Sequence, residues 1–506
     1  MPSRALRGSI TVFLSLCSLV FLTLFAAVFS SVATASGRVL AANALDQAVY
    51  SLLSRYDRDL WGSFDLFALS GNENGPDFGR CLSDVRENAE LILHPGTLLT
   101  GYAAWPDLVM EGVSVTAAGT LCGENGDALL RQAVEFMEDT LGVQAVQLLS
   151  GSVWRDASSL SSLEKAGEDA VTEEKDALLR DIEKAREEKA AGSASAPAGA
   201  APQAETQDAP PAHTPSLSGE EAGRRLGVLR KMRASSLLTF AVRDPDSISG
   251  SSLPEGFAPS SLSPFPAVGL QRPAGSAEHG TDRLLLSEYL LRHFASFREP
   301  TKTASLAYQT EYLLFGKKSD TENLEECVRS LHRIRCGAAM ITFLSDGKTM
   351  QEARSTAEAL CASAGIPELT PALSAVLIGA LAWTQGALDV RALLAGFRVP
   401  LLHRDGTQLT FETLPLVLSE PDTLLRDDPS GLGYEAYLRM LLCTCNYQEL
   451  RERVPAMIED TIRVRYARPS FRIDGCLDMI ELSMDVHIEE MLHVTVVGRQ
   501  SYRKGA

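Results

Sequence analysis

The stretch HIEEMLH, from His487 to His493, contains residue types that bind zinc. It fits neither zinc-protease template, because HExxH needs a glutamate beside the first histidine and HxxEH needs a histidine where Met491 stands. Ligands at these offsets also require a helix, whereas the surrounding pattern is that of strands and a turn. The sequence therefore favours a polar hairpin over a metal site.

A second group combines thiols with an imidazole, since Cys327, His332 and Cys336 lie on one expected helix. His332 and Cys336 are four residues apart and share a face, which would suit a thiolate site. The same segment carries apolar residues at helical spacing, namely Leu324, Val328, Leu331 and Ile334. Packing in a helical core is therefore the favoured interpretation.

Three further patterns bear on catalysis or nucleotide binding. The DRD stretch at 57–59 and the pair Asp474 and Asp478 bring carboxylates together, but no second catalytic partner is evident beside them. Gly431 and Gly433 precede a helix without the strand that a dinucleotide site needs. GxSxG and the P-loop motif are absent from the sequence. We therefore predict no catalytic residues, no cofactor and no enzyme activity.

The composition argues against a surface that binds nucleic acid. The 506 residues carry a net charge of −18, and no cluster of Lys and Arg alternates with aromatic residues. This length predicts two or three folded units. The nine cysteines form no CxxC motif. In an oxidising compartment Cys81 and Cys122 would be the preferred disulfide, and otherwise the thiols would pack as small buried hydrophobes.

A long apolar run opens the chain and must set the position of the later elements. No charge and no proline occur from Ser9 to Ser30, and about twenty helical residues cross a bilayer. Arg4 and Arg7 precede the run and Arg38 is the first charge after it, so we expect a single-pass protein of the cell membrane with a cytoplasmic amino end. Small residues would allow other membrane helices to approach, the alternative being lipid contact alone. These are Gly8, Ser9, Thr11, Ser15 and Ser18.

The end of the apolar run leaves a second interpretation open. Ala33-Thr34-Ala35 has the form of a signal-peptide cleavage site, and cleavage there would yield a secreted binding protein. However, the run is longer than a signal h-region, and helical spacing continues beyond it. We therefore expect one helix from about Ser9 to about Leu60, with its second half packed on an outer head. The expected packing residues are Leu45, Val49, Leu52, Tyr56, Leu60 and Trp61.

The remaining patterns predict an α+β fold that is mainly helical, with short antiparallel strands. A strand is expected at 110–118, a helix stop at Gly142, and a helix start at Ser319 followed by Glu322. Separate helices are expected at 371–383 and 387–394. The predicted regions are a cytoplasmic stub at 1–8, a membrane part at 9–35, a helix continuation with a small α+β region at 36–160, a charged helix with a low-complexity insert at 161–280, a helical domain at 281–467 and carboxy-terminal strands at 468–506.

Several segments together resemble a membrane-anchored family of Gram-positive bacteria, a domain of unknown function found with tight-adherence (Tad/Flp) pilus genes. The segments are GSITVFLSL (8–16), ALDQAVYSLLSRYDRDLWGSFDLFAL (44–69), LLRQAVEFM (129–137), EYLLFGKKSDTENLEECVRSLHRIR (311–335), DVRALLAGFRVPLL (389–402) and YEAYLRMLL (434–442). The resemblance implies an exported, anchored and non-catalytic component. Its implied partners are membrane lipid and pilus or pseudopilin subunits.

The residues before the apolar run, Arg7-Gly8-Ser9, also resemble the start of TadE/TadG-like pseudopilins. Those proteins usually carry a glutamate about five residues into the run, where this chain has Phe13. Packing into a pilus shaft and processing by a prepilin peptidase are therefore not implied. Beside an assembly or adaptor component, a membrane-tethered hydrolase with an unrecognised site remains an alternative.

Overall fold

The computed structural model describes residues 6–94, 106–123, 126–170, 184, 217–262, 264–266, 268–269, 275–403, 408–488 and 492–503. The chain divides into two compact units, and two or three separate segments build each of them. Unit 1 comprises Met1–Thr140, Gly256–Asp282 and Arg451–Ala506, and unit 2 comprises Leu141–Glu255 and Arg283–Leu450. Helices predominate over a three-stranded antiparallel sheet, which confirms the predicted α+β class.

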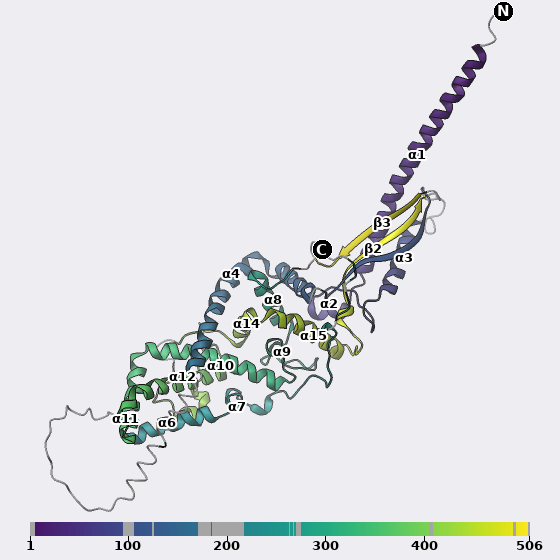
Figure 1. Cartoon of the computed structure of the whole chain (residues 1–506). Helices are drawn as coiled ribbons and strands as arrows, with labels where there is room; N and C mark the ends of the chain where they lie inside the picture. The colour runs from purple at the N-terminus through teal and green to yellow at the C-terminus, as the bar shows by residue number, and fades with distance from the viewer. Residues whose placement is uncertain are drawn as a thin grey trace, which may run out of the picture. The chain divides into compact units, whose positions relative to one another are not determined.

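Helix α1, Leu6–Leu53, is the longest element of unit 1 at 48 residues, or about 70 Å. Its first half projects freely and its second half lies along strands β2 and β3 (Figure 1). The helix ends earlier than predicted, because the chain turns after Leu53 and a separate helix α2, Arg58–Phe64, follows. Asp57 starts α2 by accepting hydrogen bonds from the backbone N–H groups of Asp59 and Leu60.

The sheet joins residues that lie far apart in the sequence. Strand β1, Leu108–Thr120, pairs with β2, Leu477–Ile488, and β2 pairs with β3, Leu492–Ser501, giving the order β1-β2-β3. The predicted strand at 110–118 and the carboxy-terminal strands are confirmed. The register of β1 shifts between Met110 and Gly112, which leaves Glu111 as a bulge residue.

One face of the sheet packs against α1 and α3, Phe78–Leu93. Side chains of β2 alternate as the strand period requires, and those facing the helices are fully buried. The core includes Ile480, Leu482, Met484, Val486 and Ile488 from β2, with Val85 and Ala89 from α3. Unit 1 is therefore a sheet covered by two helices, one of which extends beyond it.

Two further connections complete unit 1. Helix α4, Asp127–Ala170, begins here, and Asp127 forms an ion pair with Arg451 in α15, Tyr447–Arg465. Glu459 of α15 is fully buried and accepts a hydrogen bond from the backbone N–H of Ile473 at 3.0 Å. The chain thus fastens its last helix to the segment that leads into β2.

Unit 2 is helical. Its elements are the second part of α4 from Leu141 onward, α6 (Gly219–Ala234), α7 (Leu237–Ala241), α8 (Gly280–His293, which begins in unit 1), α9 (Gln309–Phe315), α10 (Asp320–Ser345), α11 (Gly347–Ala364), α12 (Thr370–Leu394), α13 (Leu416–Ser419) and α14 (Tyr434–Thr444). Short 3-10 turns connect them: η3 (Pro245–Ser247), η5 (Pro367–Leu369) and η6 (Pro421–Leu424), while η4 (Ser260–Leu262) and η7 (Ile473–Gly475) belong to unit 1. Helices α10, α11 and α12 form its core with α6.

Three local predictions can be compared with the helices directly. Ser319 caps α10 and accepts a hydrogen bond from the N–H of Glu322, as predicted. The backbone leaves the helical region at Gly142 (φ 70°), so the predicted stop is a kink after which α4 resumes. The two helices expected between 371 and 394 are one helix, α12, because Thr384 to Gly386 stay helical within the core. Of the predicted charged helix and low-complexity insert at 161–280, residues 171–183 and 185–216 lie outside the described residues.

Candidate functional site

The free half of α1 is a continuous apolar surface. Side chains from Ile10 to Val32 are exposed, apart from the half-buried Cys17, and Phe21 and Phe25 are exposed by 71% and 70%. The hydroxyl of Ser15 donates to the carbonyl of Val12 at 2.9 Å, so it places no unpaired donor on this surface. Thr11 and Ser18 are also exposed, whereas the side chains of Gly8 and Ser9 lie outside the described residues.

The change from exposed to buried occurs at Ala33, which is 5% exposed. From there the buried residues follow helical spacing down one side of α1. They are Ala33, Gly37, Ala41, Ala44, Leu45, Ala48, Val49, Leu52 and Leu53. Glycines permit the closest approaches: a Cβ on Gly37 would stand 2.7 Å from Cδ1 of Ile488, and one on Gly498 would stand 2.9 Å from Cγ of Leu45.

Aromatic residues surround the end of α1. Tyr56 is half-buried and meets Phe67 edge-on with ring centroids 5.0 Å apart. Leu60 is fully buried, whereas Trp61 is 42% exposed and contacts Tyr56 with centroids 5.8 Å apart. Tyr502, after β3, donates its hydroxyl to the carbonyl of Leu53, which satisfies one of the last carbonyls of the helix.

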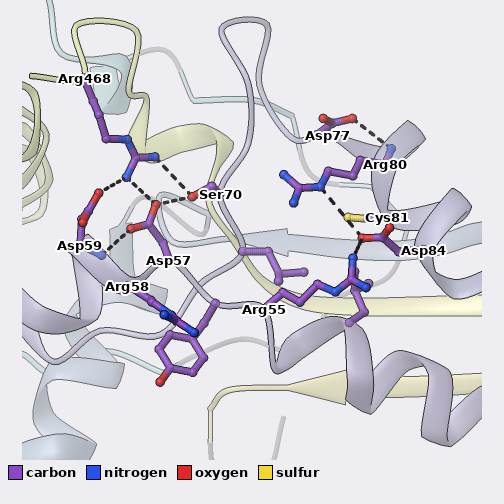
Figure 2. A pocket seen from close by; sticks show the side chains of 13 residues that line it. Arg55, Asp57, Arg58, Asp59, Ser70, Asp77, Arg80, Cys81, Asp84 and Arg468 are labelled. Atoms are coloured by element: carbon purple, nitrogen blue, oxygen red, sulfur yellow. Dashed lines mark hydrogen bonds and ion pairs between the residues drawn. The ribbon is translucent and has the colours of Figure 1, made fainter. Parts of the chain in front are cut away.

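A charged pocket of about 250 Å³ opens beside the end of α1 (Figure 2). Its lining contains four arginines and four aspartates, with one serine, one cysteine and a few apolar residues. These arginines and aspartates come from the end of α1, from α2, from α3 and from the segment after α15. The charged lining residues are Arg55, Arg58, Arg80, Arg468, Asp57, Asp59, Asp77 and Asp84.

Arg468 organises one side of the pocket (Figure 2). It donates to Asp57 and to Asp59, each at 2.9 Å, and Asp57 also accepts a hydrogen bond from Ser70. Although burial alone would raise it, the pKa of Asp57 is lowered by the hydrogen bonds from Ser70 and the Leu60 N–H and by the charge of Arg468. This carboxylate therefore stays ionised and serves as a structural anchor.

Arg55, Asp84 and Cys81 form the opposite side of the pocket (Figure 2). Arg55 donates to Asp84 at 2.7 Å. Burial raises the pKa of the Cys81 thiol to about 11, and Asp77 and Asp84 add to that effect. A thiol with this pKa is a weak nucleophile near neutral pH. The pocket is therefore suited to holding charged groups and lacks an activated thiol.

The structure places the predicted hairpin histidines opposite one another. His487 of β2 and His493 of β3 are paired residues, with ring centroids 5.4 Å apart. Nε2 of His487 lies 2.8 Å from Glu111, and Nε2 of His493 lies 3.3 Å from the same carboxylate. The sequence does not reveal Glu111, because the bulge that turns it toward the histidines follows from pairing over more than 350 residues.

The expected core histidine and cysteines of α10 are buried, as predicted. His332 is 5% exposed, and its Nε2 lies 2.9 Å from the carbonyl of Trp383. Burial lowers the pKa of His332 to about 4, so the ring is neutral near pH 7. Cys327 and Cys336 are fully buried. All nine cysteines carry free thiols in the structure, and Cys81 and Cys122 are both buried.

The other sequence candidates lie in separate surroundings. Asp474 pairs with Arg472 at 2.8 Å, and Asp478 pairs with Arg503, so each carboxylate has its own arginine. A Cβ on Gly431 would stand 2.6 Å from the backbone of Val399, which explains a glycine there without a nucleotide. Each of these features is accounted for by local packing.

Sequence reasoning missed a buried polar cluster in unit 2. Arg335 of α10 is fully buried and donates to Asp389 of α12 through Nε at 2.9 Å and Nη2 at 2.7 Å. Nε2 of His403 lies 2.9 Å from the same carboxylate, while its Nδ1 is buried and has no hydrogen-bond partner among the described residues. Burial would raise the pKa of Asp389, but the charges of His403 and Arg335 outweigh it and bring the pKa to about 2. Asp389 and His403 line a pocket of about 190 Å³.

Comparison with known proteins identifies a family. A protein family described as a family of unknown function (DUF5702) matches residues 217–488, more than half of the chain. The chain belongs to this family. No curated protein and no solved structure matches it.

The DUF5702 match covers the buried polar cluster of unit 2 more fully than the charged pocket beside α1. It contains Arg335, Asp389 and His403, together with all of β2. It leaves out α1, β1 and every residue of the charged pocket except Arg468. The apolar helix and most of the pocket therefore belong to the part of this chain that lies outside the matched region.

Proposed function

We propose that this DUF5702 protein is anchored in the cell membrane by the first half of α1 and acts as a structural or assembly component, without catalysis. The supporting observation is the change in α1 from side chains exposed all round, Ile10–Val32, to a helix buried along one side from Ala33 onward, where Val39 and Leu40 are still exposed on the other side. The exposed stretch rises about 33 Å, close to the hydrocarbon thickness of about 30 Å. Soluble proteins rarely expose a continuous apolar surface of this size.

The charges that flank the helix favour an amino end in the cytoplasm. Arg4 and Arg7 precede the apolar stretch and Arg38 follows it after Ala33. Arginine and lysine next to membrane helices are retained on the cytoplasmic side. The head would then lie on the extracytoplasmic side of the membrane. Among the described residues a second helix, at 367–394, is long and apolar enough to span a bilayer, but 89% of its 18-residue apolar window is buried, so it serves as a core helix of unit 2.

Membrane fractionation of two matched variants tests the anchor. Phe21→Asp places a charge at the middle of the proposed span, where insertion costs about 2.5–3.5 kcal/mol. Tyr50→Asp places the same charge on the same helix at a residue that is 72% exposed but lies beyond the span. We expect Phe21→Asp to reduce the carbonate-resistant membrane fraction and Tyr50→Asp to leave it unchanged.

Mass measurement of the mature amino terminus separates anchoring from secretion. An intact terminus before Gly8 in the membrane fraction is the expected result. A mature chain that begins at Ser36 in the medium would overturn the anchor and favour a secreted binding protein. The two outcomes differ by the whole apolar stretch, so intact mass alone distinguishes them.

We propose further that the partners in the membrane are pilus or pseudopilin subunits of the tight-adherence type. The support is the resemblance of residues 7–16 to the start of TadE/TadG-like pseudopilins and the small residues on this part of the helix. An encoded photo-crosslinker at Ser18 should capture such a subunit in cells, while one at Tyr50 should not. A clean monomer after mild detergent extraction, with no product from Ser18, would contradict this assignment.

A further inference from the structure

One end of the sheet in unit 1 lies level with a defined point on α1. Ile488 of β2 pairs with Leu108 of β1 and with Leu492 of β3, so these three residues form the last rung of the sheet. The side chain of Ile488 fills the space beside Gly37, where an added Cβ would stand 2.7 Å from its Cδ1. The rung is therefore fixed to the helix at Gly37.

Gly37 is five residues beyond Val32, the last residue of the exposed apolar stretch, which is a rise of about 7.5 Å. A bilayer is about 40–45 Å thick with its headgroups and about 30 Å without them, so each headgroup layer is about 5–7.5 Å deep. If Ile10–Val32 spans the hydrocarbon, the last rung of the sheet reaches the outer headgroup layer. This step rests on the proposed membrane anchor.

Apolar side chains are exposed at this end of the sheet. Leu492 is 37% exposed, and Val109, next to the last rung on β1, is 51% exposed. At this end of the sheet β2 ends at Ile488 and β3 begins at Leu492. Exposed apolar residues next to a membrane helix are expected to enter the interfacial layer, because their burial there is favourable.

We propose that this end of the sheet, defined by Val109, Ile488 and Leu492, contacts the headgroup layer of the membrane that holds α1. The contact would fix the head against the bilayer at a second point and so restrict the tilt of unit 1 relative to the membrane. Of the possible occupants, a lipid surface is favoured over a protein because the rung is continuous with the proposed span through Gly37.

The charges beside the rung indicate which lipids fit. Glu111, His487 and His493 form one cluster, and Asp485 lies 3.8 Å from His493. Two carboxylates face two histidines, and Arg38, exposed beside Gly37, adds one positive charge, so the groups beside the rung offer no excess of positive charge that would attract anionic lipid. The contact should therefore form on zwitterionic bilayers and gain little from anionic lipid.

Depth-dependent quenching in proteoliposomes tests the contact with the full chain. An environment-sensitive fluorophore is attached through an encoded residue at Leu492, at Val109 as a second position, or at Val497 as the control, which is 58% exposed on the same strand farther from the rung. A fourth probe at Phe21 reports the span. The bilayers are phosphatidylcholine with a nitroxide either at the headgroup or deep in the acyl chain.

We expect headgroup nitroxide to quench the Leu492 and Val109 probes several-fold more than the Val497 probe, and acyl nitroxide to quench the Phe21 probe. Added phosphatidylserine should not raise the quenching at Leu492. Quenching at Leu492 and Val109 no greater than at Val497, with Phe21 quenched, would overturn the contact and leave the anchor intact. An unquenched Phe21 probe would instead overturn the anchor and, with it, this inference.

Discussion

Gly337 of α10 lies directly against Leu163 of α4, and a Cβ on Gly337 would stand 1.8 Å from the carbonyl oxygen of Leu163. The contact is reciprocal, because a Cβ on Gly167 would stand 2.0 Å from the carbonyl oxygen of Arg333. Both obstacles are backbone atoms, which no side-chain rotation can remove. Within unit 2 the two helices therefore meet through their backbones, as only glycine allows.

Gly337→Ala should destabilise unit 2 strongly, since the two helices must move apart to admit one methyl group. Overpacking of a core typically costs about 1–3 kcal/mol, and a clash with backbone should reach at least the upper end, about 3 kcal/mol. The measurement is the change in the denaturant midpoint of the full chain in detergent, followed by circular dichroism.

Gly227→Ala is the matched control, because Gly227 lies in α6 of the same unit and a Cβ added to it would meet no atom within 4 Å. Alanine favours the helix over glycine by about 1 kcal/mol, so this variant should be as stable as the parent or more so. Equal midpoints for both variants would show that α4 and α10 are not packed as described.

Glu311 gives unit 2 a dependence on pH near neutrality. Its side chain is fully buried, Oε1 accepts hydrogen bonds from Tyr434 at 2.6 Å and from the Phe297 N–H at 2.9 Å, and Oε2 has no partner among the described residues. Burial raises the pKa of this carboxyl from 4.5 to about 7, against the lowering effect of those hydrogen bonds. The folded protein thus holds a proton that the unfolded chain releases.

Stability should therefore fall as the pH rises from about 4.5 to about 7, and the loss should total about 3 kcal/mol. Above pH 7 the folded carboxyl ionises as well and the loss stops increasing. Glu311→Gln keeps an acceptor and removes the titration, so its stability should exceed that of the parent at pH 8. Melting temperatures from pH 4 to 8 measure this effect.

Glu299→Gln serves as the comparison, because Glu299 is exposed in the segment that leads into α9. Its pH profile should follow that of the parent. If the melting temperatures of Glu311→Gln also run parallel to those of the parent from pH 4 to 8, the Glu311 carboxyl is not protonated in the folded state.

A feature of this fold can be predicted from the sequence when it depends on neighbouring residues, and it cannot when it depends on contacts between residues far apart in the chain. Local periodicity identifies α1 and the buried face of α10, because helical spacing is set by neighbouring residues such as Leu324 and Val328. The predicted end of α1, at Leu60, lies well beyond the observed end at Leu53. Asp57, which starts α2 after the turn, is also held by Ser70 and by Arg468, and Arg468 lies 411 residues away in the chain.

The candidate sites depend on long-range pairing still more strongly. Glu111 meets His487 through a bulge in a strand pair that joins the two ends of the chain. Arg335 and Asp389 are 54 residues apart and belong to different helices. Neither pair has a local signal beyond the residue types themselves, so spacing within the sequence could not reveal them.

His332 should make unit 2 sensitive to acid. Burial lowers its pKa from 6.5 to about 4, so the folded protein holds the neutral ring while the unfolded chain takes up a proton first. The stability due to this group is complete above pH 6.5 and is lost as the pH falls toward 4, by about 3 kcal/mol. His332→Gln keeps a donor for the Trp383 carbonyl and should flatten the profile between pH 4 and 6.5.

His279→Gln removes an exposed histidine and is expected to leave the acid limb of the profile unchanged. Chemical denaturation at half-unit pH steps would resolve the difference between the two variants. Because titration of Glu311 opposes this effect, the comparison is made in the Glu311→Gln protein. If the stability of that protein is the same at pH 6.5 and pH 4.5, His332 is not a neutral, buried group in the folded state.

The ion pair of Arg335 and Asp389 should cost far more to break than an exposed pair of the same unit. Asp389→Asn leaves the guanidinium of Arg335 without its carboxylate at a position with no exposed surface. Removing one partner of a buried pair typically costs about 3–5 kcal/mol, because the remaining charge is desolvated and uncompensated. Replacing both partners, as in Arg335→Met with Asp389→Leu, should cost less than Asp389→Asn alone.

Arg354→Ala provides the surface reference, since Arg354 pairs with Glu358 at 3.1 Å in an exposed position on α11. Exposed pairs of this kind contribute about 0–1 kcal/mol. Denaturant midpoints of the parent and the three variants form the comparison. If Asp389→Asn costs no more than Arg354→Ala, then water reaches Arg335 in the absence of the carboxylate, and the cluster around His403 is open to solvent rather than sealed in the helical core.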